Sequence, residues 1–204
     1  MFFCFACLRL CPSQSNVYQG FCSVCGDDLS VSPGSDQSGS SLFLCRGVLR
    51  ALTLRAKVHG DWQAMMLLCR LFVSHPRTLK EVSRSASVMA VPSSFWGRIR
   101  GKPDLAWMLT KKLSESGGVS MKSAPFQLFW RVQKRARARA RSHCDLNLAR
   151  PESSISTLII DDVITTGFSI NRLASAIGDS NCRYLTLSVA TTYASQTGPD
   201  SGEF

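Results

Sequence analysis

The stretch that decides the fold reads Thr157-Leu-Ile-Ile-Asp161-Asp162-Val-Ile-Thr165-Thr166-Gly167-Phe-Ser169-Ile170. A short apolar run ends in two carboxylates, and a small turn then leads into residues with helical spacing. A buried parallel strand followed directly by a helix is typical of α/β proteins. We therefore expect the turn to lie at the carboxyl end of a strand, where open α/β sheets bind their ligands.

The turn after the carboxylates favours an anion. Turn N–H groups and the N-terminus of the next helix converge there and stabilise negative charge. Thr165, Thr166 and Ser169 add hydroxyl donors. Gly167 lacks a side chain that would hinder the approach of a phosphate. These residues predict a monophosphate site, and the competing interpretation is a turn that only caps the helix.

The two carboxylates need a different partner, because a phosphate would repel them. Asp161 and Asp162 suit sugar hydroxyls or hydrated magnesium, both of which carboxylate oxygens bind. A ribose 5-phosphate would satisfy the carboxylates and the turn together.

The run closely resembles the phosphoribosyl-pyrophosphate (PRPP) signature of type I phosphoribosyltransferases, a hydrophobic strand followed by Asp-Asp-x-x-Thr-Thr-Gly-x-Thr. Ser169 stands where the family commonly has threonine, and it keeps the hydroxyl group. The resemblance implies that Asp161 and Asp162 are the catalytic-site carboxylates that meet the ribose hydroxyls. It also implies that the PRPP site includes Val163, Ile164, Thr165, Thr166, Gly167 and Ser169, of which the last four hold the 5-phosphate.

The chain as a whole resembles the ComF/GntX family, in which a cysteine-rich zinc module precedes a phosphoribosyltransferase domain. Further segments that fit are Leu54-Arg-Ala-Lys57-Val-His59-Gly60-Asp61, Val91-Pro92 with Arg98-Ile-Arg100-Gly101, and Gln127 before an arginine-rich stretch. After Arg-Gly the family usually continues Phe-Asn-Gln, whereas this chain has Lys102-Pro103-Asp104. Any family role of those positions in recognising a base or a partner therefore does not carry over.

Two C-x-x-C pairs lie near the N-terminus and consist of Cys4, Cys7, Cys22 and Cys25. Four thiolates in tetrahedral array are what a structural zinc ion requires, and a filled set leaves no open position for catalysis. The alternative is that these cysteines are small core residues. The spacing leaves open whether Cys11 or Cys45 replaces one of the four.

Composition divides the chain into a cysteine-rich segment over residues 1–29, a Ser/Gly-rich linker over 30–41 and a remainder over 42–204. The cysteine spacing predicts that the first is a zinc-binding module, and the resemblance implies that the last is a phosphoribosyltransferase-like domain. Apolar spacing predicts helices over 42–57, 63–73, 105–113, 126–141 and 170–177, and strands over 87–91, 157–160 and 184–190. Strand and helix alternate, so we predict an α/β fold with a doubly wound, mainly parallel sheet.

The chain has 204 residues, 45% of them hydrophobic, which argues against global disorder. Its formal net charge of +10 attracts phosphate-bearing partners but does not choose between nucleotides, nucleic acid and anionic membrane. No stretch approaches the roughly 18 to 20 apolar residues of a membrane span, and the N-terminus lacks the basic region of a signal peptide. We therefore expect a soluble, cytoplasmic protein whose cysteines are metal ligands and core residues rather than disulfides.

Basic residues form three further candidates. Arg98 and Arg100 follow a predicted strand end and suit pyrophosphate, although an ordinary solvated loop fits equally well. The basic run over 131–141 is either a solvated helix or a contact for single-stranded nucleic acid. Lys57 and His59 are interpreted as cations that favour the end of a helix.

Two functions follow as hypotheses. The first is an enzyme that binds magnesium and PRPP and transfers the phosphoribosyl group to an unknown nitrogenous acceptor. Some purine-specific relatives carry an aspartate at the position of Thr165, so no carboxylate base is assigned here. The second, which the ComF resemblance implies, is an accessory protein of DNA uptake that binds single-stranded DNA or a helicase without turnover.

Overall fold

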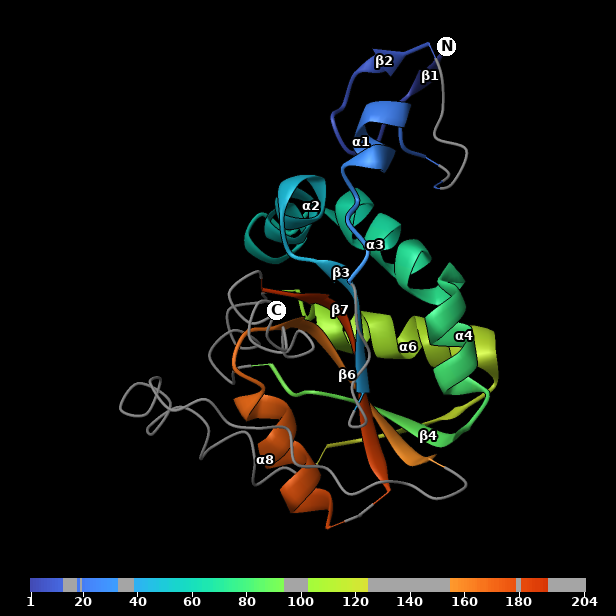
Figure 1. The fold of residues 1–204 in the computed structure, drawn as a ribbon, viewed down its shortest axis with the longest axis vertical. Helices are drawn as coiled ribbons and strands as arrows, with labels where there is room; N and C mark the ends of the chain where they lie inside the picture. Colours follow the sequence, from blue (N-terminus) through green and yellow to red (C-terminus); the bar gives the residue numbers. More distant parts are fainter. Residues whose placement is uncertain are drawn as a thin grey trace, which may run out of the picture.

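A parallel sheet flanked by helices forms the centre of the molecule (Figure 1), as the sequence predicts. The computed structural model describes residues 1–12, 18, 20–32, 39–93, 103–124, 155–178 and 181–190. The predicted helix over 126–141 and the candidates Arg98 and Arg100 lie outside these residues.

The sheet has five strands in the order β3-β7-β6-β4-β5, and every neighbouring pair is parallel. The strands are β3 (Gly39–Leu44), β4 (Ser85–Ala90), β5 (Ser120–Lys122), β6 (Ile155–Ile164) and β7 (Cys182–Val189). The strands β4, β6 and β7 confirm the three predicted apolar runs. Residues 157–164 of the deciding stretch belong to β6, the central strand.

The main helices are α2 (Gly47–Val58), α3 (Trp62–Ser74), α4 (Pro76–Val82), α6 (Leu105–Gly117) and α8 (Phe168–Ile177). Asp61 caps α3 by accepting the N–H of Ala64, and Asp104 caps α6 by accepting the N–H of Trp107, both at 3.0 Å. In the part of the chain that the structure describes, no helix has the length and apolar character needed to cross a bilayer.

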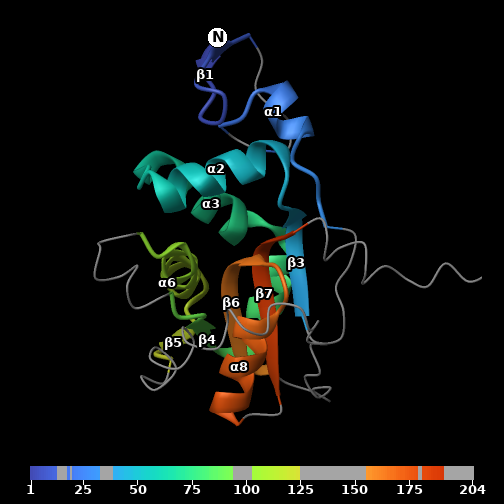
Figure 2. The same ribbon diagram turned by 90° about the vertical axis from the view of Figure 1, so that its left-hand side faces the viewer.

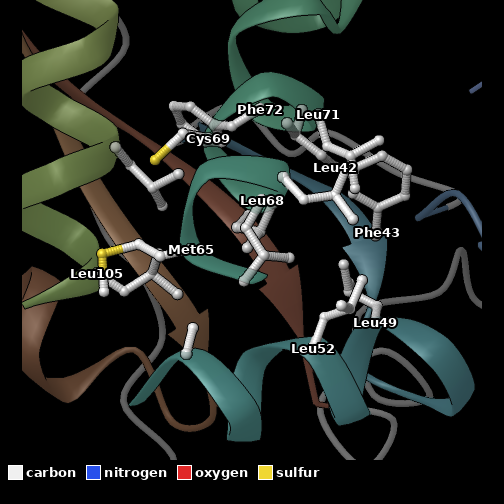
Figure 3. Close-up of a cluster of buried hydrophobic side chains, with 14 of the residues drawn as sticks. Leu42, Phe43, Leu49, Leu52, Met65, Leu68, Cys69, Leu71, Phe72 and Leu105 are labelled. Carbon is white, nitrogen blue, oxygen red and sulfur yellow. The ribbon is translucent and has the colours of Figure 1, made fainter. Parts of the chain in front are cut away.

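The two faces of the sheet are covered by different helices. Leu158 and Ile160 belong to one buried cluster with residues of α2, α3 and α6, whereas Ile159 belongs to a second cluster with residues of α8. This division follows from the two-residue period of a strand. Figure 3 shows part of the first cluster, including Met65 and Leu68 of α3. Helices on both faces are consistent with a doubly wound fold.

Three expectations need correction. Residues 39–41, which were assigned to the linker, begin β3, where their small side chains are buried against β7. The helix predicted over 42–57 begins only at residue 47, because residues 42–44 complete this strand. The strand predicted over 157–160 extends through residue 164, so both carboxylates lie within it.

The cysteine-rich segment packs on the helices and contains β1 (Phe2–Phe3), β2 (Leu10–Cys11) and α1 (Ser23–Asp27). Figure 2 shows it on the side of α2 that faces away from the sheet. The Nη1 atom of Arg55 donates to the carbonyl oxygens of Phe5 and Ala6 at 3.3 and 3.2 Å. The Asp28 carboxylate accepts the N–H of Val48 at 2.6 Å in the first turn of α2. The segment is therefore anchored at both ends of this helix.

Candidate functional site

The candidate site lies at the carboxyl end of β6, beyond the point where β4 stops pairing with it. On one side β4 pairs with β6 only as far as Ala90 opposite Ile160, while β7 continues to Val189 opposite Ile164. Pro92 follows soon after β4 and has no N–H with which to extend the ladder. The segment from Asp161 to Ile164 is consequently paired on one side, and on the other side no described strand pairs with it.

A cleft of about 440 Å³ occupies this opening. Its polar or charged lining residues are Lys57, Ser93, Asp104, Asp161, Asp162 and Ser169. They come from the end of α2, the segment after β4, the start of α6, β6 and the start of α8. The cleft thus lies outside the carboxyl ends of the strands, where open α/β sheets bind ligands.

The two carboxylates point to opposite faces of β6, since successive side chains alternate along a strand. Asp162 is buried, and its Oδ2 lies 2.7 Å from the ammonium nitrogen of Lys57. The Oδ1 atom of Asp161 accepts the N–H of Asp162 at 2.8 Å. Asp162 therefore faces α2, and Asp161 faces the side on which α8 packs.

Burial and neighbouring charges shift the pKa values of Asp161 and Lys57. Burial raises the pKa of Asp161 well above its usual value, and the neighbouring charge of Asp162 raises it further. Burial alone would lower the pKa of Lys57, but the attraction of Asp162 and the hydrogen bond to it outweigh this effect and raise that pKa. The ligand-free site therefore holds a proton on Asp161 more firmly than an exposed carboxyl group would.

The predicted phosphate turn surrounds a second, smaller hollow of about 30 Å³. It is lined by Asp161, Val163, Ile164, Thr165, Thr166, Gly167, Phe168, Ser169 and Ile170. Gly167 precedes α8 and has a φ of 69°, a left-handed conformation that favours glycine. The hollow is large enough for a few atoms of an anion beside the first N–H groups of α8.

The structure brings together every predicted ligand residue of the deciding stretch. Asp161, Val163 and Ser169 line both the cleft and the hollow, so the two spaces adjoin. Asp162 lines the cleft, and Ile164, Thr165, Thr166 and Gly167 line the hollow.

Sequence reasoning missed two members of the site. Lys57 does lie in the last turn of α2, as interpreted, but it also reaches the cleft and pairs with Asp162. Asp104 was noted only as a departure from the family pattern, and it lines the same cleft. The sequence signal for Asp104 is its position as the cap of an apolar helical run. The pairing of Lys57 depends on a contact across 105 residues, which spacing along the chain does not reveal.

The four predicted cysteines form a compact group that could hold a metal ion. The sulfur atoms of Cys4, Cys7, Cys22 and Cys25 lie within 4.8 Å of one another. Backbone N–H groups donate to two of them, from Cys22 to the Cys4 sulfur at 3.3 Å and from Cys25 to the Cys22 sulfur at 3.5 Å. Burial raises the pKa of Cys4, but backbone hydrogen bonds outweigh it and lower this pKa to about 6. Neither Cys11 nor Cys45 belongs to the group.

Comparison of the chain with protein-family models, with curated proteins and with solved structures finds no match. The geometry of the cleft and of the cysteine group therefore carries the functional interpretation.

Proposed function

We propose that this chain binds PRPP with magnesium in the cleft beside β6 and transfers the phosphoribosyl group to a nitrogenous acceptor. The observation that carries the proposal is the position of the two carboxylates: Asp161 lines both the cleft and the hollow at the start of α8, and Asp162 lines the cleft. On this proposal the domain is of the type I phosphoribosyltransferase kind, and the chain is a member of the ComF/GntX family.

The 5-phosphate would bind in the hollow. Its oxygens accept hydrogen bonds from the first N–H groups of α8 and from the hydroxyl groups of Thr165, Thr166 and Ser169. Gly167 permits close approach of the phosphate to the backbone, because it has no side chain at the turn. A phosphate held there extends its ribose toward the adjoining cleft.

The ribose hydroxyls would meet the carboxylates. Asp161 and Asp162 accept hydrogen bonds from the sugar, and their oxygens are also suitable ligands for hydrated magnesium, which usually takes one or two carboxylates. The residues present therefore fit this ion. The chemistry that magnesium supplies when bound is neutralisation of the diphosphate group.

In the reaction the bond between ribose C1 and the diphosphate oxygen breaks, and the diphosphate leaves with the electron pair. A bond forms between C1 and a nitrogen of the acceptor, which then loses a proton. The transition state carries positive charge on the ribose ring, so the carboxylates contribute by positioning the ring and by stabilising that charge. No covalent bond to the protein is needed.

The cysteine group would hold a structural zinc ion. Four sulfur ligands fill a tetrahedral site, and thiolates are the usual ligands of zinc in such sites. We assign it no part in the reaction. The alternative of an accessory role in DNA uptake depends on the basic run over 131–141, which lies outside the described residues.

Titration calorimetry of the full chain with PRPP, with and without magnesium, tests the proposal. We expect saturable binding that strengthens with magnesium, and weaker binding of ribose 5-phosphate that magnesium changes little. Absence of PRPP binding under both conditions, in protein with a normal thermal melt, would refute it.

A further inference from the structure

Lys57 lines the cleft, and the proposed function gives it no role. It belongs to the last turn of α2, and its ammonium nitrogen lies 2.7 Å from Oδ2 of Asp162. The Lys57 side chain is 41% exposed, whereas that of Asp162 is 11% exposed. The ammonium group therefore has open cleft on one side and a buried carboxylate on the other.

The charges in the cleft are unbalanced without this lysine. Asp104, Asp161 and Asp162 line the cleft, and among its described lining residues Lys57 is the one cation. Carboxylates so close together repel one another unless a cation or a proton intervenes. Lys57 thus supplies positive charge beside Asp162, as a bound cation would.

The ammonium group of Lys57 and a magnesium ion would compete for Oδ2 of Asp162, because two cations at one oxygen repel each other. A lysine suits such an exchange, because its ammonium is a compact charge on a flexible four-carbon stem with three rotatable donors. The exposed side of Lys57 faces the cleft, where the diphosphate of PRPP would bring negative charge.

We propose that Lys57 is an exchangeable counter-ion: it neutralises Asp162 in the ligand-free protein, releases it when the carboxylates take up magnesium, and then pairs with the diphosphate of PRPP. This inference rests on the proposed function. It makes Lys57 a positioning residue for the carboxylates and a binding residue for the leaving group.

The exchange predicts that removing Lys57 changes the affinities for magnesium alone and for PRPP in opposite directions. A purely structural ion pair would not produce this result. Without Lys57 the carboxylates lack their own cation, so magnesium alone should bind more tightly. Without Lys57 the diphosphate lacks a partner, so PRPP at saturating magnesium should bind more weakly. A structural pair, once lost, would disorder the carboxylates and weaken both.

The experiment compares the full-length parent with Lys57→Met by titration calorimetry. The matched control is Lys111→Met, since Lys111 is an exposed lysine of α6 that lies 3.9 Å from Glu115 and away from the cleft. For Lys57→Met we expect magnesium alone to bind about threefold to tenfold more tightly, as fits one partly exposed ion pair. We expect PRPP at saturating magnesium to bind about tenfold more weakly. Binding of ribose 5-phosphate should be unchanged, and Lys111→Met should match the parent throughout.

Thermal melting gives a second readout that does not depend on PRPP. In magnesium-free buffer Lys57→Met should melt below the parent, and added magnesium should raise its melting temperature more than it raises that of the parent. Should Lys57→Met fail to fold, Lys57→Gln retains an N–H donor for Asp162 and is measured in its place, with the same expected signs.

Magnesium binding that is unchanged or weaker in the lysine variant, or absent from both proteins, overturns the exchange. If the parent does not bind PRPP, the proposed function fails, whereas the comparison of magnesium alone still decides whether Lys57 and the ion compete for Asp162.

Discussion

At the scale of single residues, Asp161 and Asp162 are neighbours in β6 but lie in unequal environments. The sequence predicts that both carboxylates lie next to a buried strand and a small turn, because both features are local in the chain. It does not predict their unequal environments, since Asp161 and Asp162 face different helices and only Asp162 meets Lys57. That difference arises from packing across the sheet.

The raised pKa of Asp161 predicts how stability depends on pH. The usual value is 3.8, and burial and the charge of Asp162 place the folded-state pKa well above it. As the pH rises above the usual value, the unfolded chain releases this proton while the folded chain retains it. The contribution of Asp161 to stability is therefore present below that value and is lost as the pH rises through the folded-state pKa.

Asp161→Asn removes this titration. Thermal melts in magnesium-free buffer, from about pH 4 to 8, should show the parent losing melting temperature relative to Asp161→Asn as the pH rises. If both proteins show the same pH profile, Asp161 has no raised pKa in the folded protein.

At the scale of elements, apolar periodicity predicted the helices α3, α6 and α8 and the strands β4, β6 and β7. It missed β3, because Gly39, Ser40 and Ser41 have the composition of a linker. In the sheet these small residues pack against β7, and the Ser41 and Thr186 hydroxyl groups lie 2.7 Å apart. A strand segment whose polar residues are buried through cross-strand hydrogen bonds cannot be recognised from the spacing of apolar residues.

The N-terminus of α8 offers a direct test of the phosphate hollow, because a glycine in a similar conformation lies at each end of this helix. Gly167 precedes it with a φ of 69°, and Gly178 follows it with a φ of 66° and open space around it. Alanine at either position should cost about 1 kcal/mol of unfolding free energy in urea titrations.

Only Gly167→Ala should also weaken ribose 5-phosphate binding, by about tenfold, since a methyl group then intrudes where the phosphate approaches the backbone. Gly178→Ala serves as the matched control for the loss of stability. Equal ribose 5-phosphate affinity in the two variants would contradict the placement of the phosphate.

At the scale of the whole molecule, the cysteine-rich segment and the sheet share one continuous core. Cys4, Phe21 and Cys22 are buried in the same cluster as residues of α2 and α3. The segment was predicted from its cysteine spacing, but its attachment to α2 through Arg55 and Asp28 was not. Such contacts join residues far apart in the chain, and neither periodicity nor spacing encodes them.

Zinc should therefore stabilise more than the segment that binds it. Purified protein should carry one zinc ion per chain by metal analysis, and chelation should lower the melting temperature of the whole chain. Cys7→Ser should lose the metal, whereas Cys45→Ser, outside the four-cysteine group, should retain it. Full zinc content in Cys7→Ser would contradict the assigned ligands.

We propose that the carboxylate pair of the intact molecule holds the ribose of PRPP together with magnesium. Replacing Asp161 and Asp162 by asparagine keeps shape and size while removing the charge, and thermal melting controls for the fold. In titrations of this double variant, magnesium PRPP should bind at least about tenfold more weakly than in the parent, because charge-assisted hydrogen bonds are each worth about 1.5 to 3 kcal/mol. Ribose 5-phosphate should lose less affinity, since its phosphate still meets the turn. Magnesium PRPP binding equal to that of the parent would contradict the account.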